Sequence, residues 1–130
     1  MSDKTDLNTL LKTMNPTLHD GEYVFCAVNA LNDTDINDIV LFFREEEAVT
    51  IIISKETAIR LNLKFIFIAA WITLTVNSSL EAVGFTAVFS NALSQKGISC
   101  NVVAGYYHDH IFVNSNDAEK AMEILANISG

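Results

Sequence analysis

The sequence predicts an α+β fold in which helices cover one face of an antiparallel sheet. Residues 71–76 alternate apolar and polar side chains, as a strand with one buried face does. Apolar residues at helical spacing follow at 80–88 and again at 118–128. Between these helices lie two β-rich runs, 98–104 and 108–114, with a turn at Gly105. The order β-α-β-β-α favours helices packed on an antiparallel sheet.

The first half of the chain predicts more strand than helix. A short helix over 6–14 should end at Asn15-Pro16, because proline cannot continue a helix. Residues 22–28 resemble a strand, and 39–44 with 49–53 resemble a hairpin whose tip is the triple glutamate 45–47. Ser54 can cap a short helix through Leu61.

The helices of the second half have their own start and stop signals. Ser78 and Glu81 have the spacing of a capping box, and Gly97 should end the helix that follows. Asn116, with Glu119 three residues later, is expected to cap the last helix. The core face of that helix should consist of Ala118, Ala121, Met122, Leu125 and Ile128.

Composition excludes several classes of partner. The chain has 130 residues and a formal net charge of −8. Binding to nucleic acid or to an anionic membrane surface needs an excess of Lys and Arg, so we expect neither partner. The apolar stretch 61–76 is too short and too interrupted to span a bilayer. Residues 1–12 lack the apolar core of a signal peptide, and Cys26 and Cys100 fit buried reduced thiols, so a cytoplasmic location is expected.

The second half resembles a known regulatory fold. Gly84 lies thirteen residues before Gly97, and the intervening helix contains Phe-Ser-Asn-Ala-Leu at 89–93, followed by Gly-Ile-Ser-Cys at 97–100. Together with Asn-Asp-Ala-Glu-Lys-Ala at 116–121, these motifs resemble the ACT domain, in particular the regulatory ACT segment of aspartokinases. The likeness covers 71–128, and residues 22–61 look like a degenerate second ACT unit.

The resemblance implies ferredoxin-like β-α-β-β-α units in tandem. We expect an N-terminal helix plus a degenerate ACT-like unit at 1–63 and an ACT domain at 64–130. The whole chain is similar to small stand-alone bacterial proteins with tandem ACT-like folds. Such units typically bind a small amino acid at an interface between two units.

The resemblance also implies a binding site. A carboxylate needs unpaired backbone N–H groups near a helix N-terminus, and an ammonium group needs oxygens. The matching loop and strand supply the candidate ligand-binding residues Asn77, Ser78, Ser79, Val83, Gly84, Phe85, Thr86, Ser99, Cys100, Asn101 and Val102.

Purely structural interpretations of these residues remain open. Ser78 and Ser79 can simply cap a helix, Gly84 can simply allow helix–sheet packing, and Asn101 can be a solvated strand residue. The sequence also departs from the family pattern, because Val83 stands where ACT domains have proline and 78–82 are additional residues. A helix that began one turn early would cover the amides that face a ligand.

The run Tyr-Tyr-His-Asp-His at 106–110 is the other candidate. Tyr107 and His108 are expected to contact a ligand or to lie in an interface. As an alternative, His108 and His110 share a strand face and could chelate a divalent ion. That alternative lacks a third ligand, since Asp109 should point to the other face and His19 cannot be placed.

No nucleophile–base pair or metal set emerges from the sequence, so we expect neither an enzyme nor a cofactor. The predicted function is that of a stand-alone, allosteric, non-catalytic ACT-type regulatory module that binds a small amino acid and forms a homodimer. The alternative is a ligand-free oligomerisation or protein-interaction module that regulates a metabolic enzyme, since dimerisation would cover an edge strand.

Overall fold

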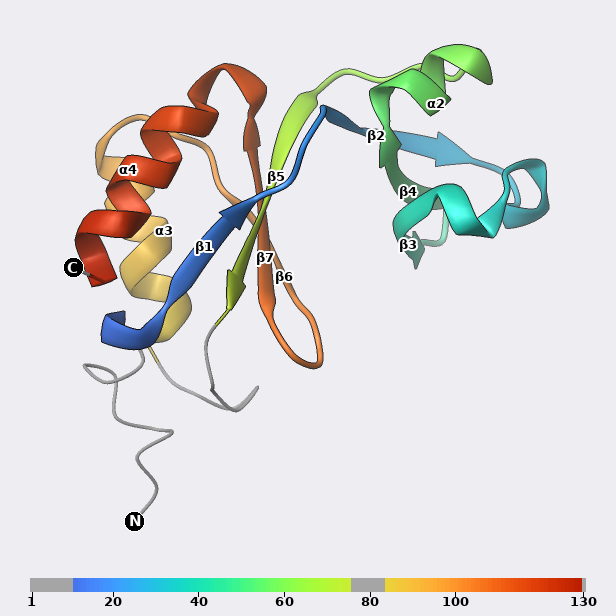
Figure 1. The fold of residues 1–130 in the computed structure, drawn as a ribbon. Helices are drawn as coiled ribbons and strands as arrows, with labels where there is room; N and C mark the ends of the chain where they lie inside the picture. Colours follow the sequence, from blue (N-terminus) through green and yellow to red (C-terminus); the bar gives the residue numbers. More distant parts are fainter. Residues whose placement is uncertain (1–10, 76–83, 130) are drawn as a thin grey trace. The chain divides into compact units, whose positions relative to one another are not determined.

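The computed structural model describes residues 11–75 and 84–129 of the chain (Figure 1). It consists of two compact units. Unit 1 comprises Met1–His19 and Ala70–Gly130, and unit 2 comprises Asp20–Ala69. Strand β5 (Ile68–Thr75) begins in unit 2 and continues into unit 1.

Unit 1 is a sheet with two helices on one face. Strand β1 (Asn15–Leu18) lies antiparallel to β5, and β6 (Asn101–Ala104) lies antiparallel to β7 (Asp109–Asn114). Strands β5 and β7 are neighbours. Helices α3 (Phe85–Gln95) and α4 (Ala118–Ser129) lie together beside these strands (Figure 1). Their apolar side chains share one core with alternate residues of β5 and β7, namely Ile72, Leu74, Ile111 and Val113.

This arrangement confirms the predicted α+β class and the β-α-β-β-α order, here β5-α3-β6-β7-α4. The predicted end of the first helix is also confirmed. Gly97 has a φ of 77° and lies directly after α3. The N–H groups of Gly97 and Ile98 donate to the carbonyl oxygens of Ser94 and Leu93, at 2.9 and 3.0 Å. These two bonds satisfy helix carbonyls that would otherwise lack a donor.

The starts of the two helices are set by different residues. Helix α3 begins at Phe85, after its N-cap Gly84, which has a left-handed φ of 88°. Ser78 and Glu81 themselves lie outside the described residues. Before α4, Asn114 rather than Asn116 is the capping side chain. Its Oδ1 accepts the N–H of Asn116 at 3.0 Å and so begins a short 3₁₀ turn, η4 (Ser115–Asp117).

Strand β1 was missed. Of the helix predicted over 6–14, residues 11–13 are helical and 6–10 lie outside the described residues. The chain then enters β1 at once, with Pro16 opposite Leu74 of β5. Among the described residues β1 pairs with β5 alone, so the missing N–H of Pro16 can face away from its one neighbour.

Unit 2 contains the predicted strand, hairpin and capped helix. Its strands are β2 (Tyr23–Val28), β3 (Ile39–Arg44) and β4 (Val49–Ser54), ordered β3-β4-β2, and helix α2 (Lys55–Arg60) follows β4. The hairpin β3–β4 and the Ser54 cap are confirmed. A separate core joins the strands to the helix through Val24, Cys26, Val28, Ile51, Ile53 and Ala58.

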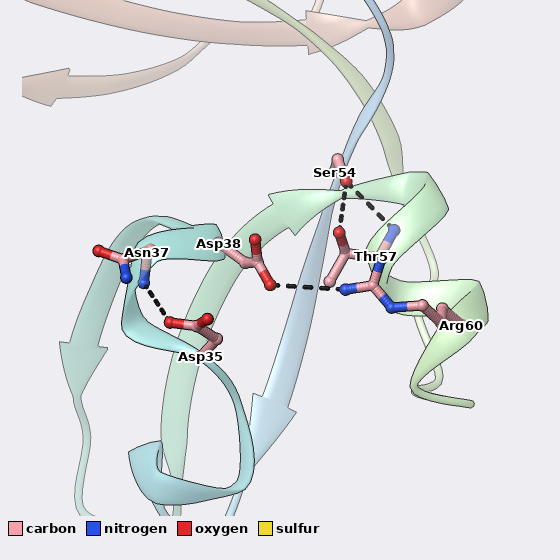
Figure 2. A network of polar contacts seen from close by, with 6 residues as sticks. All are labelled: Asp35, Asn37, Asp38, Ser54, Thr57 and Arg60. Carbon is pink, nitrogen blue, oxygen red and sulfur yellow. Dashed lines mark hydrogen bonds and ion pairs between the residues drawn. The ribbon is translucent and has the colours of Figure 1, made fainter.

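Polar contacts fix the ends of α2 and of the turn before β3 (Figure 2). Ser54 Oγ accepts the N–H of Thr57 at 3.1 Å, which caps α2. At the other end of the helix, Arg60 Nη2 lies 3.5 Å from Asp38 Oδ2. Asp38 ends the 3₁₀ turn η3 (Ile36–Asp38), which follows another, η2 (Leu31–Asp33). The exposed ion pair contributes little stability, so the cap is the stronger of the two contacts.

Candidate functional site

A groove in unit 1 contains part of the predicted site. It runs between α3 and the segment that leads into β6, and it has a volume of about 750 Å³. That volume lies within the range of small-molecule sites. It is lined by Ala87, Val88, Ser90, Asn91, Ser94, Ile98, Ser99 and Cys100. Of the candidate residues, the structure therefore brings Ser99 and Cys100 together with the outer face of α3.

The periodicity of α3 produces the helical wall of this groove. Phe85, Phe89 and Leu93 are buried in the core of unit 1. The groove side has small residues at helical spacing, Ala87, Ser90, Asn91 and Ser94. The helix has no charged residue, so this wall offers hydroxyl and amide groups without a fixed charge. This wall was not predicted from the sequence, although the helical spacing of its small residues is visible there.

The opposite wall is also uncharged. Ile98 is buried and holds the segment against the core, while Ser99 is exposed at the groove. Burial raises the pKa of the Cys100 thiol to about 11. Cys100 is therefore a neutral thiol at physiological pH, and buried thiols of this kind are usually inert.

The other candidate residues of the strand, Asn101 and Val102, already make contacts within unit 1. The side-chain amide of Asn101 donates to the carbonyl oxygen of Phe112 at 3.3 Å. Val102 packs against the core of unit 1. Among the described residues, β6 pairs with β7 alone, which leaves its other edge open.

The loop candidates are placed only in part. Asn77, Ser78, Ser79 and Val83 lie outside the described residues. Gly84 forms the left-handed N-cap of α3 and makes no side-chain cap. Thr86 is exposed.

Phe85 can serve the predicted site only through its backbone. It is 2% exposed and belongs to the core, because it is the first residue of the apolar face of α3. Its side chain is therefore not available to a ligand.

A second polar cluster lies on the face of the unit 1 sheet opposite the helices. His19 stacks on Trp71 with ring centroids 3.6 Å apart, and its Nε2 lies 2.7 Å from Thr73 Oγ1. The indole N–H of Trp71 donates to His110 Nδ1 at 3.1 Å. Thr73 Oγ1 also lies 3.1 Å from His110 Nδ1. We call these four residues the His110 cluster. His19 could not be placed from the sequence, and the His110 cluster was not predicted.

The predicted His pair does not form a metal site in the described part of the chain. The rings of His108 and His110 are 6.4 Å apart between centroids. No group of three or more His, Cys, Asp or Glu residues within 11–75 and 84–129 is arranged to hold a metal ion. Tyr106 and Tyr107, at the β6–β7 turn, are 82% and 77% exposed.

Unit 2 has a further hollow of different chemistry. It has a volume of about 540 Å³ and is lined by Asp20, Gly21, Glu22, Tyr23, Ser54, Lys55, Glu56 and Ile59. Its one lysine already pairs with Glu22 at 3.4 Å. The lining therefore has an excess of negative charge, which disfavours a carboxylate ligand.

Comparison with known families decides the assignment. One ACT domain model matches residues 2–70, and a second ACT domain model matches residues 67–127. The chain belongs to the ACT domain family. It consists of regulatory-type ACT domains in tandem, as the sequence motifs indicated. No catalytic domain is evident in the described residues, and none of the helices described is long and apolar enough to cross a membrane.

Several solved structures resemble this ACT protein. A Vibrio cholerae protein of unknown function, described as a possible transport protein, is 44% identical, with a TM-score of 0.88 over 97% of this chain and 98% of that chain. An Agobacterium tumefaciens protein is 21% identical, with a TM-score of 0.67 over 89% of each chain. The comparison with curated proteins found no match.

A third structure comes from an aspartate kinase. The ligand-free regulatory subunit of the Thermus thermophilus enzyme is 8% identical, with a TM-score of 0.69 over 89% of this chain and 98% of that chain. At this identity the likeness concerns the fold alone.

Proposed function

We propose that this ACT protein is a stand-alone regulatory module that binds a small amino acid in the groove along α3. The observation that carries the proposal is the groove itself. Its lining consists largely of small side chains and includes neutral hydroxyl and amide groups. A zwitterion has one positive and one negative end, and a lining of fixed charge of either sign would repel one of them. Asn91, Ser94 and Ser99 offer both donors and acceptors without that penalty, and Ser90, whose hydroxyl donates to the Thr86 carbonyl oxygen at 2.7 Å, offers an acceptor.

An ACT unit of another copy would close the open side of the groove. The segment Ile98–Cys100, which leads into β6, borders the groove, and the open edge of β6 can pair with a strand of a second chain. Closing the groove in this way would remove the ligand from water and link binding to association. A ligand that prefers the associated state then shifts the equilibrium towards it, which is how such a module would transmit a signal.

A thermal-shift screen over the common amino acids tests the binding step. An amino acid at a hundred times its Kd should add about 2.7 kcal/mol to the free energy of unfolding, which raises the melting temperature by several degrees. The variant Asn91→Leu removes a polar group from the groove wall and should abolish the shift. Asn127→Leu, on the exposed face of α4, is the matched control and should keep it. A screen in which no amino acid raises the melting temperature would refute the binding proposal.

A second candidate function rests on a different observation. The exposed face of α3 has no charged residue although the chain has a net charge of −8, and one edge of β6 is open among the described residues. An uncharged helix face and a free strand edge each suit association with a second copy, because most soluble oligomers are symmetric homo-oligomers. The protein would then be an oligomerisation module that acts on a metabolic enzyme without a ligand.

Sedimentation measurements distinguish the two functions. Ala104→Lys places a charge on the exposed edge of β6 and should convert a dimer into a monomer, whereas Asn127→Lys on α4 should leave it dimeric. Dimerisation that depends on Ala104 but is unaffected by every amino acid would favour the ligand-free module. A monomer at all concentrations would exclude it.

A further inference from the structure

We propose that His110 forms a pH-sensitive latch, which holds β7 to Trp71 of β5 only while the His110 ring is neutral. The inference concerns the His110 cluster, on the sheet face opposite the groove, and does not depend on amino-acid binding. The evidence is which nitrogen and oxygen atoms of the cluster can donate a hydrogen bond and which can accept one.

The indole N–H of Trp71 fixes the protonation state of its partner. An indole nitrogen is a donor only, so His110 Nδ1 must accept the bond that spans 3.1 Å. A ring nitrogen that accepts has no proton, and the single proton of the neutral ring therefore sits on Nε2. A protonated ring would have an N–H at both nitrogens, and the Trp71 donor would then face another donor.

Thr73 provides the alternative partner for the protonated ring. Its hydroxyl oxygen lies 3.1 Å from His110 Nδ1 and 2.7 Å from His19 Nε2. A hydroxyl has one proton to donate and can accept as well. When His110 takes up a proton from solvent, its Nδ1–H can donate to Thr73 Oγ1, and the two lone pairs of this oxygen can also accept the Nε2–H of a protonated His19. The latch thus exchanges its Trp71 bond for a Thr73 bond.

The surroundings favour the neutral, latched state. The titratable groups that face His110 are His108 on its own strand and His19 after β1. Asp109 is the neighbouring carboxyl, but strand alternation directs it to the other face. Burial, followed by the charges of His108 and His19, lowers the pKa of His110 below its ordinary value. The Trp71 bond therefore persists at neutral pH and is lost in acid.

The cluster connects three segments of unit 1. His19 is the last residue of the first segment of unit 1, and its backbone N–H donates to the Trp71 carbonyl oxygen at 2.9 Å. Trp71 also stacks on Phe112 of β7, with centroids 6.1 Å apart. Loss of the His110 bond in acid would remove a link between β5 and β7 while leaving the helix-side core in place.

Nitrogen-15 NMR of the full chain tests the latch. Trp71 is the only tryptophan, so its indole N–H gives one unambiguous signal. That signal should shift in a single step, with a midpoint below about pH 6.5, the ordinary pKa of histidine. The same midpoint should appear at the His110 ring nitrogens, and at neutral pH the proton of His110 should be on Nε2.

Three variants separate His110 from its neighbours. His110→Gln should abolish the step at the indole signal. His108→Gln and His19→Gln should keep the step and raise its midpoint, because each removes a nearby positive charge. A step that survives in His110→Gln, or that disappears in His19→Gln, would overturn the proposal. If His110→Gln does not fold, a neutral His110 with its proton on Nδ1 in the wild type would overturn it equally.

Discussion

The backbone N–H of Ile98 donates to the carbonyl oxygen of Leu93 at 3.0 Å, across the turn made by Gly97. This bond ends α3 and turns the chain into the wall of the groove. Leu93 and Ile98 are both buried, so the bond also places two core residues on either side of the turn. The geometry of the groove therefore depends on one left-handed residue.

Gly97→Ala should destabilise unit 1 by about 1 kcal/mol, the cost of a left-handed conformation for a residue with a Cβ. A Cβ at this position would meet nothing within 4 Å, so the loss is expected from the backbone alone. Gly97→Asn should lose less, because asparagine tolerates this conformation. Urea denaturation of both variants measures the difference. Equal losses for alanine and asparagine would show that the φ of 77° is not the cause.

Ser54→Ala should destabilise unit 2 by about 1 kcal/mol, since it removes the acceptor for the N–H of Thr57. Ser54→Asp keeps an acceptor at the same position and should retain most of the stability. Denaturation followed by circular dichroism gives both values. A full loss in the aspartate variant would mean that the serine acts by a route other than capping.

Asp109→Asn should stabilise the protein at neutral pH. Burial raises the pKa of Asp109, so the folded state binds a proton more readily than the unfolded state. The stability linked to this group is present below the unfolded pKa of about 3.9 and is lost as the pH rises through the higher folded pKa. The gain from asparagine should thus be largest at neutral pH and should shrink in acid. Denaturation curves at several pH values check this, and a gain that is independent of pH would contradict it.

Cys100 should react slowly with iodoacetamide at neutral pH, because the thiolate is the reactive form and the pKa of this thiol is about 11. The rate should rise steeply towards alkaline pH. Measured on a Cys26→Ala background, alkylation followed by mass spectrometry reports Cys100 alone. Rapid modification at neutral pH would show that the thiol is activated rather than masked.

Local periodicity was sufficient to predict most elements of this fold. The alternation of Trp71 to Thr75, the turn at Gly97 and the cap at Ser54 all depend on neighbouring residues, and all are present. Strand β1 was not predicted because Asn15-Pro16 only indicates where a helix ends, whereas the strand forms through pairing with β5, far away in the sequence. Asn116 was predicted as the cap in place of Asn114 because both side chains can cap a helix. The sequence does not show that a 3₁₀ turn, which Asn114 caps, precedes α4.

The candidate site was only partly predictable. Ser99 and Cys100 were found through family motifs, but their contact with Ser90, Asn91 and Ser94 requires the packing of α3 against the strand. The His110 cluster shows the same limit. His19 and His110 are ninety-one positions apart and meet only through Thr73 and Trp71 of the intervening strand.

The most direct test of amino-acid binding is a titration of the nitrogen-15-labelled chain with each common amino acid. The account predicts that at least one of them shifts the backbone amide signals of the groove residues Ser90, Asn91, Ser94, Ser99 and Cys100, while those of unit 2 stay in place. If every amino acid leaves the groove signals unchanged, or if the shifts fall on unit 2 alone, the α3 groove is not the binding site.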